Sequence, residues 1–189
     1  MFKNPTINIV KKRVIRLMQA TQIARRIEDL RRSLSKKGDV NTSASATLLS
    51  ILGVIRRIEK IEKVIRCIST NKKSCIDIGK GNLCRSECSN AFVLELGNEK
   101  KIWRIGGNAF GSNFSEDKIK IGIKDLKIEV YLDKISVGIN GSTLDIPANA
   151  KEIAENSYLI TSVANKIDSN LRNALIGLAE CAKSLGLRC

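Results

Sequence analysis

The spacing of hydrophobic residues divides the chain into helical and extended parts. Up to residue 68, apolar side chains recur every three or four positions, which is the period of amphipathic helices. A first helix is predicted from the cap residues Asn4 and Pro5 to Gly38. A second is predicted from residues 41–43 to about residue 68, and the link between the two is short, so we expect an antiparallel helical hairpin over residues 1–70. The seam of the second helix comprises Leu48, Ile51, Ile55, Ile58, Ile61, Ile65 and Ile68.

Beyond residue 90 the hydrophobic period becomes two. Gly97-Asn98, Asp133-Lys134 and Asn140-Gly141 supply turn signals between the alternating runs. The pattern predicts an antiparallel β-meander of five or six strands over residues 91–146, with one buried face. Its apolar positions are Phe92, Leu94, Leu96, Ile119, Ile121, Ile123, Leu126, Ile128, Val130, Leu132, Ile135, Val137 and Ile139.

After Pro147 the helical period returns. Apolar and small residues alternate in steps of four and three from Ile153 to Leu185, which is a sustained heptad pattern. This pattern has two interpretations: packing against the first two helices, or self-association through a coiled coil. Its positions are Ile153, Ser157, Ile160, Ala164, Ile167, Leu171, Ala174, Leu178, Cys181 and Leu185.

These patterns together predict an α+β fold. The basic helical hairpin over residues 1–70 and a long C-terminal helix over residues 147–189 form a helical bundle. The β-meander of residues 91–146 is inserted between them, and residues 71–90 form a cysteine-containing loop. The length of 189 residues is enough to bury one substantial core.

The positive charge of the chain is concentrated near its start. The net charge is +14, and within residues 1–73 there are 18 Lys and Arg against 5 Asp and Glu, leaving the rest nearly neutral. Such asymmetry favours a nucleic acid or another acidic surface as the partner. A negatively charged membrane surface is a further alternative. The longest uncharged run, residues 40–55, is too short to span a membrane.

The second helix carries its basic residues in a stripe. Arg56, Lys60 and Lys63 follow a spacing of four and three on one face, away from the isoleucine seam, with Arg57 and Arg66 beside them. Arg56, Lys60 and Lys63 are the central candidates for contacts with phosphate groups, whether of DNA or of RNA, and Arg57 and Arg66 are expected to help them. In the first helix the basic residues are scattered around the circumference, and the further candidates there are Arg13, Arg16, Arg25, Arg26 and Arg32.

Two aromatic residues of the predicted sheet are weaker candidates. Trp103 and Tyr131 lie among lysines on the face opposite the isoleucines, where aromatic rings can stack on the bases of a single strand. Nearby acids such as Asp125 and Glu129 make an ordinary solvated sheet face the competing interpretation.

The cysteines allow three states. Cys67, Cys75, Cys84 and Cys88 form a weak candidate zinc site, because Cys84 and Cys88 have acceptable spacing but seven residues separate the other two. Disulfides and reduced, partly buried thiols are the alternatives. Beyond this zinc possibility, no cofactor is expected.

The composition favours a non-catalytic protein. There is no histidine, which removes the commonest general base, the usual partner of a catalytic cysteine and the commonest metal ligand. The glycine-rich segments 79–82 and 106–113 lack the patterns of nucleotide-binding loops, and no small-molecule substrate is evident.

We therefore expect a cytoplasmic protein that binds the phosphate backbone of nucleic acid without catalysis. The alternative is an assembly or scaffold subunit of a nucleoprotein complex or virion, whose basic surface is merely solvated and whose partner is another protein. Abundant lysine and isoleucine with only two glutamines are typical of a thermophilic archaeon or its virus.

Overall fold

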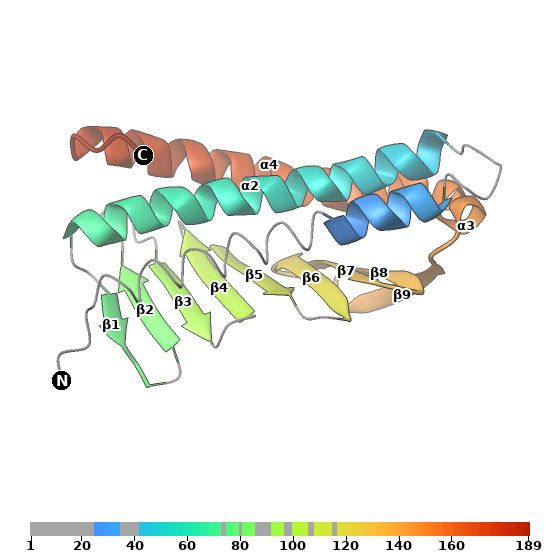
Figure 1. Cartoon of the computed structure of the whole chain (residues 1–189), viewed down its shortest axis with the longest axis horizontal. Helices are drawn as coiled ribbons and strands as arrows, with labels where there is room; N and C mark the ends of the chain where they lie inside the picture. Colours follow the sequence, from blue (N-terminus) through green and yellow to red (C-terminus); the bar gives the residue numbers. More distant parts are fainter. Residues whose placement is uncertain are drawn as a thin grey trace.

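The computed structural model describes residues 25–34, 42–72, 75–79, 81–85, 92–96, 100–105, 108–114 and 117–189. Within them the chain is an α+β protein in which helices cover one face of an antiparallel sheet (Figure 1). Residues 25–34 are helical. They are followed by the helices α2 (Thr42–Lys72), α3 (Ala150–Glu155) and α4 (Ser157–Ser184).

The described strands form one nine-stranded sheet in which every neighbour along the chain is also a neighbour in space. All eight pairings are antiparallel, so the meander predicted from the alternating pattern is present. The strands are β1 (Cys75–Asp77), β2 (Gly81–Arg85), β3 (Phe92–Leu96), β4 (Lys100–Ile105), β5 (Asn108–Phe114), β6 (Lys118–Ile123), β7 (Leu126–Tyr131), β8 (Lys134–Ile139) and β9 (Ser142–Pro147).

The sheet is larger than the sequence pattern indicated, with nine strands where five or six were expected. Two of the additional strands, β1 and β2, lie in the segment 71–90 that was expected to be a cysteine-containing loop. These strands are only three and five residues long, and too few apolar positions alternate in them to show a period of two.

Tight turns set the register of the best-defined hairpins. Asn140 and Gly141 both have positive φ, of 49° and 82°, which is the conformation of a two-residue type I′ turn and agrees with the turn predicted there. The turn expected at Asp133-Lys134 lies one residue earlier, because β8 already begins at Lys134.

Helices α2 and α4 run parallel to each other. The hydroxyl oxygens of Thr47 and Thr161 are 3.3 Å apart, and Arg57 contacts Asp168 farther along both helices. Residue numbers therefore increase in the same direction along α2 and α4. This follows from the topology, because the sheet crosses the molecule between the end of α2 and the start of α3 (Figure 1). Both helices therefore begin near β9 and end near β1.

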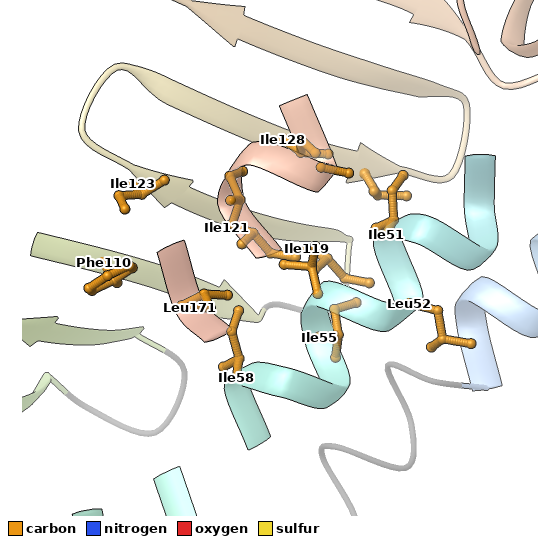
Figure 2. Close-up of a cluster of buried hydrophobic side chains, with 14 of the residues drawn as sticks. Ile51, Leu52, Ile55, Ile58, Phe110, Ile119, Ile121, Ile123, Ile128 and Leu171 are labelled. Atoms are coloured by element: carbon orange, nitrogen blue, oxygen red, sulfur yellow. The ribbon is translucent and has the colours of Figure 1, made fainter. Parts of the chain in front are cut away.

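The core lies between this helix layer and the sheet. Ile51, Ile55 and Ile58 of α2 and Leu171 of α4 approach Ile121 and its strand neighbours (Figure 2). The predicted seam of α2 is fully buried, with no member above 2% exposed: Leu48, Ile51, Ile55, Ile58, Ile61, Ile65 and Ile68. Burial of such side chains contributes about 1.5–3 kcal/mol each.

The heptad of the C-terminal segment belongs to the same core. The chain breaks its helix at Asn156, which ends α3, and most heptad positions on either side face inward. The buried members are Ile153, Ile160, Ala164, Ile167, Leu171, Leu178 and Cys181. The packing interpretation of the heptad therefore accounts for these residues within one chain.

The arrangement differs from a helical bundle with a separate meander. A sheet with a largely apolar face needs a cover, and α2 and α4 supply it by lying across the strands (Figure 1). In the 25–34 helix, Ile27 and Leu34 are buried in the same core. The remainder of the predicted first helix and its link to α2 lie outside the described residues, so the antiparallel hairpin stays a prediction.

Candidate nucleic-acid interface

The basic stripe of α2 lies on the surface of the helix layer. Arg56, Lys60 and Lys63 are all exposed, whereas the isoleucines on the opposite side of the helix are buried. At 100° per residue the three lie within a 60° arc centred opposite the core. They span about 10 Å along the axis. The expected position of these three residues, on one face away from the seam, is confirmed.

These three cations have no acidic partner within the part of the chain that the structure describes. The ion pair from Glu59 to Lys63 that their spacing allows is not formed between those side chains there. Arg56 and Lys60 stand four residues apart, and like charges at this spacing destabilise a helix by about 0.2–0.5 kcal/mol. The stripe is therefore a concentration of uncompensated positive charge.

The two flanking residues of the stripe are already engaged. Arg57 is half-buried and its Nε lies 2.5 Å from Oδ1 of Asp168 on α4. Asp168 also accepts from Nη2 of Arg172 at 3.3 Å, so one carboxylate holds two guanidinium groups. Arg66 is half-buried and makes an interaction of its own. A phosphate contact by Arg57 would have to break its bond to α4.

The arginines of the 25–34 helix are partly committed as well. Arg25 is exposed, while Arg26 is half-buried and lines a small cavity beside Tyr131. Glu28 accepts a hydrogen bond from Arg31 and also pairs with Arg32 at 3.4 Å, and the hydrogen bond to Arg31 lowers the pKa of this carboxyl. Arg13 and Arg16 lie outside the described residues.

The aromatic candidates of the sheet lie on strands β4 and β7. The Tyr131 ring has the Lys134 ammonium 5.1 Å from its centroid and the Lys118 ammonium 5.8 Å away. Its hydroxyl donates to Glu129 at 2.7 Å. A base would have to displace these lysines to stack on Tyr131. Trp103 pairs with Val93 and Phe110 in register, but its side chain lies outside the described part.

The charges around Tyr131 form a network across strands β6 to β9. Burial alone would raise the pKa of Glu129, but hydrogen bonds from Lys120 and Tyr131 outweigh it and the pKa is lowered. Lys134 bonds Asp145 at 2.6 Å, which raises the pKa of the lysine and lowers that of the carboxyl. This sheet face is therefore internally neutralised, unlike the stripe of α2.

One of the zinc-candidate cysteines forms a disulfide instead. Cys67, near the end of α2, is bonded to Cys189, and their Cα atoms are 5.8 Å apart. Cys181 is disulfide-bonded too, and no cysteine whose side chain the structure describes is free. Cys67 cannot act as a zinc thiolate while this bond is closed. Cys75 and Cys84 face each other in register on β1 and β2, and Cys88 lies outside the described residues.

No family model, no curated protein and no solved structure matches this chain. In the described part, no three His, Cys, Asp or Glu side chains gather as metal ligands would. No described helix combines the length and the apolar character needed to cross a membrane.

Sequence reasoning missed two residues of this surface, Tyr158 and Arg172. Tyr158 is 88% exposed, and the Arg172 side chain is 61% exposed even though it contacts Asp168. The signal for both was a second heptad on α4, which is offset from the buried one and exposed along its length. It comprises Tyr158, Ser162, Asn165, Ser169, Arg172 and Ile176.

Proposed function

We propose that this chain is a non-catalytic nucleic-acid-binding protein whose contact surface is the outward face of α2. The observation that carries the proposal is the exposed stripe of Arg56, Lys60 and Lys63. Its cations lie within a 60° arc and lack an acidic partner among the described residues. A phosphate chain relieves the mutual repulsion of these charges, and the arginine fork suits phosphate oxygens.

The shape of the helix layer favours contacts with the phosphate backbone over reading of bases in a groove. The major groove of DNA is about 12 Å wide and admits one helix. Helix α2 is joined to α4 along its length, through the Thr47–Thr161 and Arg57–Asp168 contacts. Two helices packed side by side are about 20 Å across, so α2 cannot enter such a groove alone. Backbone contacts position a protein without reading sequence.

The test is binding of labelled oligonucleotides measured by fluorescence anisotropy across a salt series. The test variant changes Arg56, Lys60 and Lys63 together to Gln. A control variant changes Lys124, Lys127 and Lys151 to Gln, which removes the same net charge from exposed positions elsewhere. Each phosphate contact contributes about 0.7–0.9 to the slope of log K against log salt, so the test variant should lose about 2 from this slope.

The control variant should lose much less of the slope. Equal losses for the two variants would show that only total charge matters and that the stripe is no site. Binding of the unchanged protein that vanishes at physiological salt for every oligonucleotide would reject nucleic acid as the partner.

A second candidate function is that of an assembly subunit that binds another protein. The supporting observation is the strand β9, the last strand of the described sheet, which exposes 46% of Leu144. An edge strand offers unpaired backbone groups to another chain. Light scattering after size-exclusion chromatography tests this candidate: Leu144→Lys should dissolve an assembly formed through β9 and leave a monomer unchanged.

A further inference from the structure

Charge is segregated along the length of the helix layer. The first 14 residues of α2, up to Ile55, contain no charged residue, and neither do the first nine of α4, up to Asn165. Because the two helices are parallel, these uncharged first segments lie side by side, and the Thr47–Thr161 contact joins them. The outward surface therefore continues from the basic stripe into an uncharged region.

Tyr158 projects from the uncharged region. It lies in the first turn of α4 and is 88% exposed, the highest value among the large hydrophobic side chains of the described residues. No hydrogen bond or ring contact engages it in that part of the structure. Tyr131, in contrast, has its ring beside two lysines and its hydroxyl bonded to Glu129. Contacts within the fold explain Tyr131 and leave the exposed Tyr158 unexplained.

The position of Tyr158 relative to the stripe follows from the pairing of the helices. Arg57 and Asp168 lie at the same height along the two helix axes, and Asp168 is ten residues after Tyr158. Arg56 is one residue before Arg57, so nine residues of α4 separate its height from that of Tyr158. At a rise of 1.5 Å per residue, the ring is about 14 Å from the level of Arg56 along the axes. Within α4, at 100° per residue, Tyr158 lies on the side of the helix opposite the buried Ile160, Ile167 and Leu171, so its ring points outward.

Resting on the nucleic-acid binding proposed above, we infer that Tyr158 is a base-stacking site and that the ligand is a single strand. The strand lies along α2 and α4, with phosphates on Arg56, Lys60 and Lys63 and an unpaired base on the Tyr158 ring. A basic track with an aromatic platform is the arrangement that binds single strands irrespective of sequence. In a duplex the bases are stacked on one another and present no free face to the ring.

The inference is tested with three labelled probes carrying similar numbers of phosphates. They are an oligothymidylate of about 12 nucleotides, an abasic strand of the same length, and a duplex. Two variants of the tyrosine are compared: Tyr158→Leu removes the aromatic face and keeps an apolar side chain, and Tyr158→Phe keeps the ring. Tyr131→Leu is the matched control on the sheet, and circular dichroism melts establish that each variant is folded.

We expect Tyr158→Leu to weaken oligothymidylate binding by about 5- to 100-fold, the loss of one stacked base. Binding of the abasic strand should stay unchanged, and Tyr158→Phe and Tyr131→Leu should bind both probes like the unchanged protein. A duplex bound more tightly than the single strand overturns the inference.

Failure of this inference is distinct from failure of the proposed function. If Tyr158→Leu binds oligothymidylate normally while the Gln variant of the stripe does not, the stacking site is rejected and the phosphate-binding surface stands. If no probe binds at physiological salt, both are rejected. Vesicles containing about one-third anionic lipid are the last probe. If Tyr158→Leu weakens binding to these vesicles but not to oligonucleotides, the surface binds membranes instead of nucleic acid.

Discussion

Arg57 of α2 and Asp168 of α4 form a half-buried ion pair, with Nε and Oδ1 2.5 Å apart, between the two parallel helices. Their side chains are only 24% and 19% exposed, so solvent screens this pair less than a surface pair. The pair connects the two helices beside the basic stripe, and Arg56, its sequence neighbour, points to solvent. Adjacent arginines therefore have different roles.

This difference gives the first prediction. Arg57→Gln should lower the free energy of unfolding by about 1–3 kcal/mol, because Asp168 is left with Arg172 as its remaining partner, while Arg56→Gln should change it by less than about 0.5 kcal/mol. The order should reverse for oligonucleotide affinity, with Arg56→Gln the more damaging. Urea unfolding and anisotropy measure the two quantities. A double-mutant cycle with Asp168→Asn checks that the stability loss comes from this pair.

The second prediction concerns the Cys67–Cys189 disulfide, whose cysteines are 122 residues apart in sequence. Closing so long a loop restricts the unfolded chain, so changing both cysteines to Ser should lower stability by about 2–5 kcal/mol. The comparison is made under oxidising conditions, which leaves the disulfide of Cys181 in place in both proteins. The melting temperature is the measurement.

The bond itself is checked by peptide mapping without reductant. Cleavage after lysine releases residues 64–72 and 184–189, and mass spectrometry should find these peptides joined. If both peptides appear singly with alkylated thiols, the two cysteines are reduced in the protein and the stability prediction fails with the bond.

The third prediction is a loss of stability in acid that comes from the sheet network. The pKa values of Glu129 and Asp145 are lowered from ordinary values of 4.5 and 3.8, so the unfolded chain binds protons more readily than the folded one. The stabilisation that these two carboxylates provide is therefore complete at pH values above their pKa values in the unfolded chain. It is lost as the pH falls through their lowered pKa values in the folded protein. Urea unfolding from about pH 6 to about pH 3 measures it.

The matched variant for this test carries Glu129→Gln and Asp145→Asn. It should be less stable than the unchanged protein at neutral pH and lose less stability on acidification. Parallel curves for the two proteins would place the acid-sensitive groups elsewhere.

The fourth prediction uses a glycine within α2. Gly53 is exposed in the middle of the helix, and a Cβ atom placed there meets nothing within 4 Å. Glycine costs a helix about 0.5–1 kcal/mol relative to alanine, so Gly53→Ala should stabilise the protein by about that amount. Gly141→Ala is the contrasting control, because φ of 82° in the β8–β9 turn strains any side chain and should destabilise. Thermal unfolding of both variants decides the matter.

Local patterns along the sequence were sufficient for much of the fold. The isoleucine seam of α2 and the alternating isoleucines of β6 to β8 are buried as their periods of 3.6 and two indicated. The exposed position of Arg56, Lys60 and Lys63 followed in the same way, because a helix that buries one side must present the other. Short strands such as β1 carry too few residues to show a period.

Only the tertiary structure decided which elements lie next to which. The sequence by itself determined that α2 and the C-terminal helix each have one buried face, but a hydrophobic face does not specify its partner, because burial is non-directional. The nine described strands cross the molecule between these helices and make them parallel. This puts Arg57 against Asp168, Cys67 against Cys189, and the uncharged start of α4 beside that of α2. Tyr158 and the basic stripe therefore share one surface through contacts between residues more than a hundred positions apart, which no local pattern contains.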